Sequence, residues 1–362
     1  MKKIISNKNL KSANKNKKDE FYTQLSDIEK ELGHYKDHFK NKIIFLNCDD
    51  PEESNFWRYF ELNFKHLGLK KLIATHFGNG RPAYKLEIVR DINNDGKINN
   101  LDIIRTPLKQ NGDFRSPECI EILKEADIVV TNPPFSLLRE YVAQLIEYNK
   151  KFIIIGNINA LSYKEIFKLI KENKIWLGYS IHSGDREFKV PDDYPLNASG
   201  YRVDDNGVKY IRVKGVRWFT NLDYKERHQD FLLYKTYKGN EDEYPKYENY
   251  DAINVNITKE IPMDYKGNIG VPITFMDKYN PEQFKIVALG IVGSVDFTSN
   301  RKMEILDKKT AKPTGRFTYN AKGTLYRLYN PKTDKSPAFQ DFENGELYTS
   351  IYARIIIKNK KI

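Results

Sequence analysis

The sequence predicts an α/β protein in which a doubly wound sheet is followed by a strand-rich half. Between residues 42 and 179, short and almost continuously apolar runs alternate with helical patterns. After about residue 180 the helical periodicity fades, and Gly, Pro, Asp and Tyr become frequent between short strand-like runs. Strands that alternate with helices indicate a largely parallel sheet with helices on both faces.

Five runs in the first half have the composition of strands that are buried on both faces. Each is six to eight residues long and apolar nearly throughout, which is typical of central parallel strands. They are KIIFLN (42–47), KKLIATHF (70–77), DIVVTN (127–132), KFIIIGN (151–157) and KIWLGY (174–179). Sheets of this kind bind their ligands beyond the carboxyl ends of the strands.

The helices between these runs have recognisable first residues. A serine whose hydroxyl can accept a backbone N–H precedes each apolar helical stripe, and one of these serines is followed by proline, which suits the first helical position. A serine followed three residues later by glutamate also predicts a capping box. The predicted starts are Ser54, with the helix closed by Gly68, Ser116 with Pro117, Ser136, and Ser162 with Glu165.

The second half contains further strand candidates, some of which could complete the first sheet. They are GVKYIRV (207–213), VRWFTNL (216–222), FKIVALGIV (284–292), TLYRLYN (324–330) and SIYARIIIK (350–358). We interpret residues 218–221 as a core strand and its turn, with a nucleic-acid platform as the alternative. The tyrosines among lysines from 234 to 250 fit a solvated loop and a DNA-facing segment equally well.

The charge is concentrated at the two ends of the chain. The protein has 60 Lys and Arg against 49 Asp and Glu, for a net charge of +11. Residues 1–18 hold seven lysines and no acid, and residues 301–362 hold 14 basic and six acidic residues, so the remainder carries −4. A nearly neutral body with basic ends favours a polyanionic partner. For residues 1–18, a solvated and flexible basic tail is the equal alternative.

Several classes of protein are excluded by composition. Two cysteines, Cys48 and Cys119, are too few for a disulfide framework or a zinc site and fit a reducing compartment. No apolar run approaches 18 residues, and the N-terminus lacks the pattern of a signal peptide. The six histidines show no metal-ligand spacing. We expect a cytoplasmic protein without a catalytic metal.

Residues 91–102 match the spacing of a calcium-binding loop almost completely, with Asp102 at the twelfth position. Such a loop lies between helices, whereas here the flanking segments KLEIVRDI and KINNLDIIR are strand-like around an Asn-Asp-Gly turn. This arrangement favours a β-hairpin, with the metal loop as the alternative.

The chemistry is carried by Asn132-Pro133-Pro134-Phe135, which directly follows the strand DIVVT and precedes a helix. Two prolines fix two φ angles and remove two donors, which leaves rigid carbonyl acceptors exposed. The Asn132 side-chain oxygen and a backbone carbonyl would together grip both hydrogens of a planar amine. An adjacent aromatic ring can stack on the base that carries this amine.

The chain resembles the EcoRI-type family of adenine-specific DNA methyltransferases, whose members use S-adenosylmethionine. The resemblance runs in order through most of the sequence rather than through one patch. Its segments are DEFYTQ (19–24), IIFLNCDDPEESNFWRYF (43–60), GDFRS (112–116), TNPPF (131–135), GVRWFTNLDY (215–224) and GVPITFMDKYNPEQF (270–284).

The family implies a Rossmann-like methyltransferase core with a mostly parallel, seven-stranded sheet. It also implies methyl transfer to the 6-amino nitrogen of an adenine flipped out of duplex DNA. Asn132 and the Pro133 carbonyl would hold the amine, Pro134 would shape the turn, and Phe135 would stack on the adenine. The residues expected to bind the cofactor are Phe21, Tyr22, Thr23, Asp50, Pro51, Ser54, Asn55, Phe56, Asp113 and Phe114.

Two features depart from the family pattern at the cofactor site. The turn after the first strand contains Glu52, Glu53 and Ser54, where related amino-methyltransferases have glycine. The acid expected after the second strand for the ribose hydroxyls is missing, since this strand ends in Thr75-His76-Phe77. The group that binds the ribose is therefore not predicted from the sequence.

We expect a basic, flexible tail over 1–18, the methyltransferase core over 19–230, and a basic, β-rich target-recognition and DNA-contact region over 231–362. Double-stranded DNA is the expected partner, and a cognate restriction endonuclease would be a functional but not a physical one. Three alternatives stay open: methylation of RNA adenine, methylation of a protein glutamine, and a non-catalytic nucleic-acid-binding relative.

Overall fold

The computed structural model describes residues 21–78, 82–182, 185–192, 194, 200–298 and 300–362. The chain divides into two compact units, Met1–Ile166 with Lys174–Glu226 and Phe167–Asn173 with Arg227–Ile362. This division falls four residues before the boundary that we predict after residue 230. The basic tail expected over residues 1–18 lies outside the described residues.

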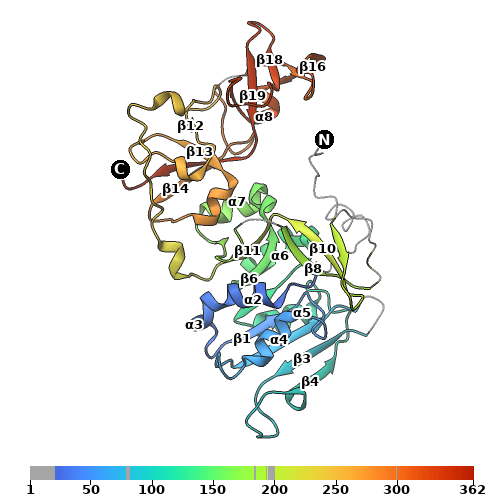
Figure 1. Ribbon diagram of the computed structural model, residues 1–362. Coiled ribbons are helices and arrows are strands. Elements are labelled where there is room, and N and C mark those ends of the chain that lie inside the picture. The colour runs from blue at the N-terminus through green and yellow to red at the C-terminus, as the bar shows by residue number, and fades with distance from the viewer. Residues whose placement is uncertain (1–20, 79–81, 183–184, 193, 195–199, 299) are drawn as a thin grey trace. The chain divides into compact units, whose positions relative to one another are not determined.

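Within the described part of the first unit, eight strands form one mixed sheet in the order β4-β3-β2-β1-β5-β6-β11-β7 (Figure 1). The pairings of β1 with β2, β1 with β5 and β5 with β6 are parallel, and the other four are antiparallel. The strands are β1 Ile43–Leu46, β2 Lys71–His76, β3 Tyr84–Ile88, β4 Ile104–Pro107, β5 Ile128–Thr131, β6 Lys151–Asn157, β7 Trp176–Leu177 and β11 Val216–Thr220.

The five strands predicted for the first half are all present in this sheet, and residues 216–220 add a sixth as β11. In place of the expected seven-stranded, mostly parallel sheet, the described residues form an eight-stranded mixed one. The antiparallel pairings lie at both ends of the sheet, with β11 and β7 beyond β6 and with β3 and β4 beyond β2. At the β2 end, only residues 77–83 connect β2 to β3. A parallel crossover needs a dozen or more residues, so β3 returns antiparallel to β2.

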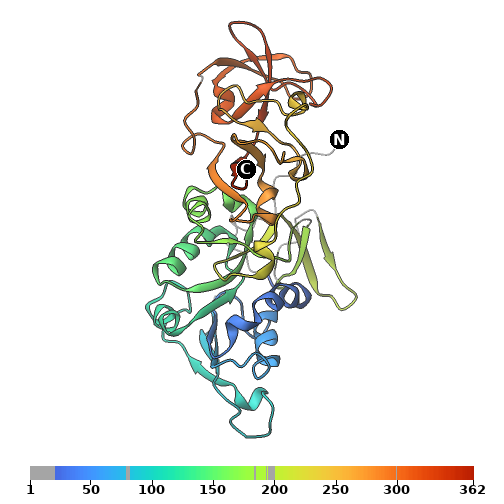
Figure 2. The ribbon, with the colours of Figure 1, turned by 90° about the vertical axis from the view of Figure 1, so that its left-hand side faces the viewer.

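Helices cover both faces of this sheet (Figure 2). On one face lie α2 (Leu25–Leu32) and α4 (Asn55–Leu62), and on the other lie α5 (Pro117–Glu125) and α6 (Leu138–Glu147). Successive strand residues point to opposite faces, so Ile44 and Leu46 join the core under α2 and α4 while Phe45 is buried from the other side. The other helices that the described residues of this half form are η1 Gly33–Tyr35, α3 Lys36–Phe39, η2 Asn100–Asp102, η3 Phe135–Leu137, η4 Ile158–Ser162 and α7 Lys164–Lys171.

Two of the predicted helix starts are confirmed. The Ser54 hydroxyl accepts from the Phe56 N–H at 3.2 Å and caps α4. The Ser116 hydroxyl accepts from the Cys119 N–H at 3.3 Å and caps α5, which has proline at its first turn.

The other two starts are wrong in detail. Ser136 lies inside η3, and α6 begins only at Leu138, because the rigid proline pair leads into a tight turn first. The Ser162 hydroxyl donates to the Asn159 carbonyl at 2.6 Å within η4. Helix α7 begins at Lys164, so Ser162 does not occupy the capping position of a capping box with Glu165.

The β-hairpin prediction for the segment around residues 91–102 is confirmed. Strands β3 and β4 pair in antiparallel register, with Tyr84 opposite Pro107 and Glu87 opposite Ile104. In the loop between them, the buried Asp102 carboxylate accepts from the Ile92 and Asn99 N–H groups. Among the described residues, no group of three His, Cys, Asp or Glu side chains is placed to hold a metal ion.

A small sheet in the order β8-β10-β9 belongs to the same unit and shares its core. Its strands are β8 Asp185–Lys189, β9 Tyr201–Val203 and β10 Lys209–Lys214. Tyr22 exchanges two backbone hydrogen bonds with Lys189, so the segment that begins at Phe21 pairs with β8.

The second unit is built from strands and short turns, as the sequence predicts. A four-stranded sheet has the order β12-β13-β20-β14, and a five-stranded sheet has the order β16-β15-β18-β19-β17, both counted over described residues. The strands are β12 Ile253–Asn254, β13 Ile269–Pro272, β14 Phe284–Leu289, β15 Lys302–Leu306, β16 Pro313–Tyr319, β17 Leu325–Leu328, β18 Phe339–Asp341, β19 Leu347–Ile351 and β20 Arg354–Asn359. The short helices of this half are η5 Lys225–His228, η6 Glu241–Glu243, η7 Thr258–Glu260, η8 Ile273–Lys278 and the left-handed turn α8 Asn320–Gly323.

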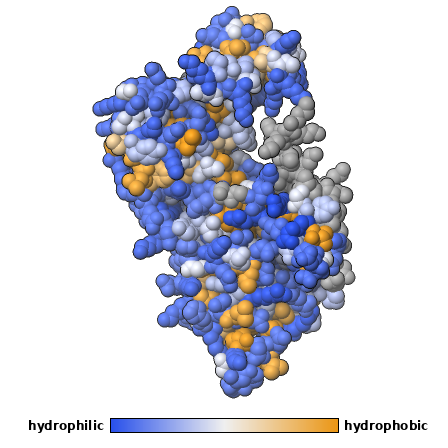
Figure 3. Space-filling model, in the orientation of Figure 1, coloured by the Kyte–Doolittle hydropathy of each residue, from blue (hydrophilic) through white to orange (hydrophobic). Residues whose placement is uncertain are grey.

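The visible surface is mostly hydrophilic, with apolar side chains scattered over it (Figure 3). Among the helices of the described segments, none is both long and apolar enough to cross a bilayer.

Candidate functional site

The Asn132 turn lies where the sheet favours ligand binding. The chain moves from β1 to β2 in one direction and then to β5 on the other side of β1. The direction of winding thus reverses between β1 and β5, and the carboxyl ends of such neighbours border a natural crevice. Asn132 directly follows β5, and residues 47–50 directly follow β1.

Asn132 is 5% exposed and presents a buried acceptor at this edge. Its Nδ2 donates to the Phe21 carbonyl, which fixes the orientation of the amide. Its Oδ1 is buried and has no hydrogen-bond partner among the described residues. A buried acceptor without a partner is costly, so this oxygen is available to a donor from a ligand.

Phe135 closes the turn within a cluster of aromatic rings. Its ring centroid lies 5.6 Å from that of Phe21 and 6.3 Å from that of Phe188, both in edge-to-face geometry. Tyr194 lies 6.2 Å from Phe21 on the same cluster. Phe135 is 8% exposed, so these neighbours cover most of its ring.

The turn after β1 is stabilised without glycine. The Glu53 and Ser54 N–H groups both donate to the Asp50 carbonyl, at 3.0 and 2.8 Å. No residue from 50 to 56, all of which the structure describes, has a positive φ, so glycine is not needed here. The Ser54 hydroxyl also donates to Asp49 at 3.0 Å.

Two predicted segments meet at the start of α4. The Asn55 Nδ2 donates to the Thr23 carbonyl at 2.7 Å, which ties residues 21–23 to this helix. Phe21 contacts the Asn132 turn at the same time. Phe56 and the turn residue Pro51 are buried. The predicted residues of 21–23, 51–56 and 132–135 therefore lie together.

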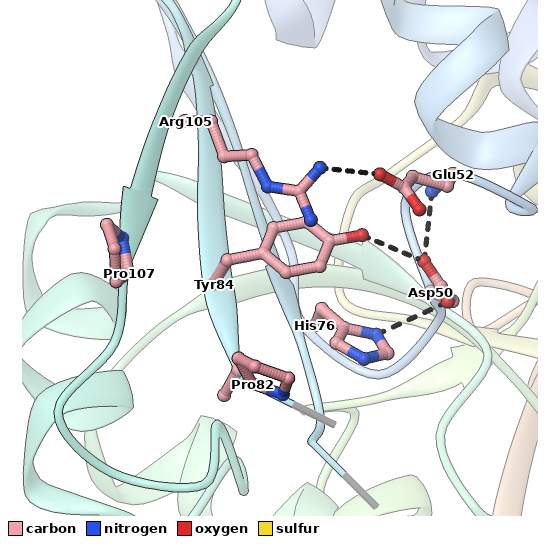
Figure 4. Close-up of a pocket in the computed structure, with 8 residues that line it drawn as sticks. Asp50, Glu52, His76, Pro82, Tyr84, Arg105 and Pro107 are labelled. Atoms are coloured by element: carbon pink, nitrogen blue, oxygen red, sulfur yellow. Dashed lines mark hydrogen bonds and ion pairs between the residues drawn. The ribbon is translucent and has the colours of Figure 1, made fainter.

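A pocket of about 400 Å³ opens beside Asp50 (Figure 4). Its volume lies within the range of small-molecule sites. Its walls come from the turn after β1, the end of β2, the start of β3 and strand β4. The lining residues are Asp50, Glu52, His76, Pro82, Ala83, Tyr84, Arg105 and Pro107.

Tyr84 contacts three of the other residues that line this pocket. Its hydroxyl donates to Asp50 Oδ1 at 3.2 Å. Its ring stacks on His76 with centroids 4.8 Å apart, and the Arg105 guanidinium lies 3.7 Å from its centroid (Figure 4). Burial, together with the Asp50 charge, raises the pKa of Tyr84, so its phenol stays protonated and holds Asp50. Arg105 is in turn anchored by Glu52 at 2.7 Å.

His76 lines the pocket and carries a second buried polar atom without a hydrogen-bond partner among the described residues. Its Nδ1 lies 3.3 Å from Asp50 Oδ2. The two atoms are within ion-pair distance, but they do not meet hydrogen-bond geometry, and Nδ1 has no hydrogen-bond partner among the described residues. Asp50 and His76 thus place an acceptor and a ring nitrogen side by side, which suits a ligand with neighbouring hydroxyls.

Gly112 packs the next loop against the end of β2. Its φ is +75°, and a Cβ built there would lie 2.3 Å from the His76 carbonyl oxygen. The Gly78 N–H donates to the Asn111 carbonyl at 2.8 Å, which holds the same two segments together. The position of His76 therefore depends on a residue without a side chain at 112.

Asp113 and Phe114, which the resemblance places at the cofactor, are engaged elsewhere in the structure. Asp113 Oδ2 lies 2.7 Å from Arg115 Nη2, and this hydrogen-bonded pair lowers the pKa of Asp113. Phe114 is buried with its ring centroid 5.0 Å from that of Tyr141. Neither residue is among those that line the pocket.

Of the predicted cofactor residues, the pocket contains Asp50, whereas His76, Tyr84 and Arg105 were not identified as site residues from the sequence. The position of His76 at the carboxyl end of a strand is a signal that could have pointed to it. Tyr84 and Arg105 come from the β3–β4 hairpin and carry no local motif. They reach the site only because the hairpin folds beside β2.

Nearly the whole chain matches a known family in a comparison with family profiles. The match is to the family described as "Adenine-specific methyltransferase EcoRI" and covers residues 9–360. The chain belongs to this family. Membership makes the protein an adenine-specific DNA methyltransferase of the type II kind, which confirms the resemblance stated from the sequence.

Three curated relatives of this EcoRI-type methyltransferase agree with the assignment. Type II methyltransferase M.EcoRI of Escherichia coli is 51% identical over 295 residues, which are 79% of this chain and 90% of the relative. M.MgeORF184P of Mycoplasma genitalium is 44% identical, over 76% of this chain and 84% of the relative. M.MpnI of Mycoplasma pneumoniae is 41% identical, over 76% of this chain and 83% of the relative.

Proposed function

We propose that this EcoRI-type methyltransferase transfers a methyl group from S-adenosylmethionine to the 6-amino nitrogen of an adenine flipped out of a short, specific duplex sequence. The enzyme would act in the cytoplasm as part of a restriction–modification system. A cognate endonuclease would recognise the same sequence without binding this protein. The single observation that carries the proposal is the buried and unpaired Oδ1 of Asn132 beyond β5.

The amine would be held by Asn132 and the turn that follows it. Asn132 Oδ1 and the Pro133 carbonyl accept its two hydrogens, which keeps the lone pair on nitrogen available for attack. Pro134, whose φ is −53°, fixes the direction of the turn. Because the Asn132 amide already donates to Phe21, its oxygen cannot rotate away from the amine.

Phe135 would stack on the extruded base. Its ring is mostly covered by Phe21 and Phe188, so entry of the base requires one of these two rings to move. Extrusion from the helix is needed because the amine of a stacked, paired adenine cannot reach an active site.

The residues of the pocket fit the nucleoside part of the cofactor. Asp50 and His76 would bind the ribose hydroxyls in place of the acid that the family has after its second strand. Residues 21–23 and 51–56 would line the path towards the Asn132 turn. Asp113 and Phe114 would lie near the adenine of the cofactor. When bound, the cofactor supplies an electrophilic methyl group, and the proton of the amine leaves to solvent after transfer. No residue is needed as a general base before the transfer.

The basic region over 231–362 would provide the phosphate contacts and the target reading, with an affinity for DNA that falls steeply as salt rises. A direct test is transfer of labelled methyl groups from S-adenosylmethionine to duplex DNA, duplex RNA and a release-factor-like protein. Label in N6-methyladenine of the DNA alone is expected. Label in RNA or protein alone, or in none of the three, would contradict the proposal.

A further inference from the structure

A basic β-ribbon forms one edge of the five-stranded sheet in the second unit. The ribbon comprises β15, the connecting tip of residues 307–312 and β16, and is called the basic ribbon below. Strand β16 is the edge strand of its sheet (Figure 1). Its side chains are exposed or half-buried along its whole length, so no other described element covers it.

The basic ribbon keeps a net positive charge. Residues 302–319 contain five basic and two acidic side chains, for a net charge of +3. Among the described residues, none forms an ion pair with the exposed side chains Lys308, Lys309, Lys312 or Arg316. The nearby Arg301, in contrast, is paired with Asp341 at 3.2 Å.

Both acids of the basic ribbon are engaged by its own backbone. The Asp307 carboxylate accepts from the Lys309 and Thr310 N–H groups, which orders the tip and lowers the pKa of Asp307. The Glu304 carboxylate accepts from the Gly315 N–H at 2.7 Å, beside an irregularity in the β15–β16 register. Such bulges increase the twist of a ribbon. The cations therefore project from an ordered, twisted support.

Exposed aromatic rings accompany these cations. Phe317 is 44% exposed and Phe342 is 57% exposed, with centroids 5.4 Å apart. Lys302 Nζ lies 4.7 Å from the first ring and 4.1 Å from the second. Tyr319, at the end of β16, is 55% exposed. Large exposed rings among unpaired cations are typical of a binding surface for nucleic acid.

We infer that the basic ribbon enters the major groove of duplex DNA and reads part of the target sequence. The inference rests on the proposed function, because it takes DNA as the substrate. The major groove is about 12 Å wide and admits a two-stranded ribbon. The tip lysines contact phosphates on its walls, and Arg316 donates to a guanine edge on its floor, which is the commonest specific contact in such grooves.

The phosphate contacts are tested with the triple variant K308Q/K309Q/K312Q in the full-length protein. Each phosphate contact contributes about 0.9 to the slope of log affinity against log salt. The slope measured with cognate duplex is therefore expected to fall by about 2–3. The matched control K36Q/K40Q/K70Q removes three exposed lysines from outside residues 231–362 and should keep the wild-type slope. Melting temperature and cofactor binding should be unchanged in both.

Base reading is tested with Arg316→Ala. Affinity for the cognate duplex is expected to fall about 10- to 100-fold, with little change for unrelated duplexes. An equal fall in the salt slope for the ribbon triple variant and the control triple variant would overturn the inference. An unchanged preference of Arg316→Ala for the cognate duplex would also overturn it. Competition by duplex RNA as strong as by duplex DNA would also overturn it, because the A-form major groove is too narrow for a ribbon. Failure of the wild type to bind DNA or to transfer methyl groups would instead overturn the proposed function.

Discussion

The Asn132 turn and the pocket around His76 border the same sheet, but they are assembled in different ways. The turn is one run of consecutive residues, and its buried Oδ1 is set by a single hydrogen bond to Phe21. The pocket draws on four segments, and Asp50 and His76 are held there by Tyr84 from the hairpin. A site made of consecutive residues depends on local geometry, whereas the pocket depends on the pairing of β2 with β3.

The largest expected effect is at the turn. Asn132→Ala should lower the rate of methyl transfer by about 10²- to 10³-fold, the range found when one preorganised polar group is removed from a reaction centre. It should lower the free energy of unfolding by only about 1 kcal/mol, through the lost hydrogen bond to Phe21. Single-turnover transfer and chemical denaturation measure the two quantities.

The matched control for this variant is Asn63→Ala. The Asn63 amide donates to the Tyr59 carbonyl at 2.8 Å beyond the end of α4, so it loses a similar hydrogen bond outside the site. Its transfer rate should equal that of the wild type. An equal fall in rate for both variants would show that Asn132 acts through stability alone.

The free energy of unfolding should depend on close packing at Gly112, beside the pocket. Gly112→Ala forces a Cβ to within 2.3 Å of the His76 carbonyl oxygen at a positive φ, and should lower the free energy of unfolding by about 2–4 kcal/mol. Gly96 has a φ of +84° with no atom within 4 Å of an added Cβ. Gly96→Ala should therefore cost about 1 kcal/mol, the conformational part alone. Equal losses of stability in the two variants would refute the role of close packing.

His76→Ala should separate cofactor binding from chemistry. The variant removes the buried ring nitrogen and the stacking partner of Tyr84, and should weaken cofactor binding about 10-fold, the cost of one hydrogen bond to a ligand. The rate at saturating cofactor should change little. His66→Ala is the control, since His66 is exposed and does not line the pocket. Calorimetry that gave the same affinity for His76→Ala and the wild type would remove His76 from the binding site.

The smallest expected effect on stability comes from removing the charge of Asp113. Pairing with Arg115 lowers the pKa of Asp113 in the folded state, so its contribution to stability is complete above its ordinary pKa of about 3.9 and disappears as the pH falls through the lowered value. Asp113→Asn should thus reduce stability by less than about 1 kcal/mol at pH 7 and by a smaller amount at about pH 3, below the ordinary pKa. Denaturation curves at the two pH values test this. A difference that grew as the pH fell would contradict the assignment.

These contrasts explain how far the sequence predicts the molecule. The five apolar runs and the caps at Ser54 and Ser116 depend on neighbours in the chain, and all are confirmed. The antiparallel return of β3 was not predicted, because it depends on the length of a connection rather than on the composition of the strand.

The same reasoning applies to the site. The Asn132 turn could be identified because its chemistry lies in adjacent residues. Tyr84 and Arg105 could not, because their proximity to Asp50 is created by strand pairing between segments that carry no motif of their own. The ion pair between Asp113 and Arg115 depends on the rotamer of Arg115, and this rotamer could not be predicted from the sequence.

The central claim is that Asn132 positions the 6-amino group of a flipped adenine for methylation. The most direct measurement is a map of N6-methyladenine in DNA from cells that express the wild type or Asn132→Ala at equal levels. We expect one short duplex sequence to be modified throughout by the wild type and to lack modification with the variant. Modification of that sequence to the same extent by both proteins, or its absence with the wild type, would contradict the claim.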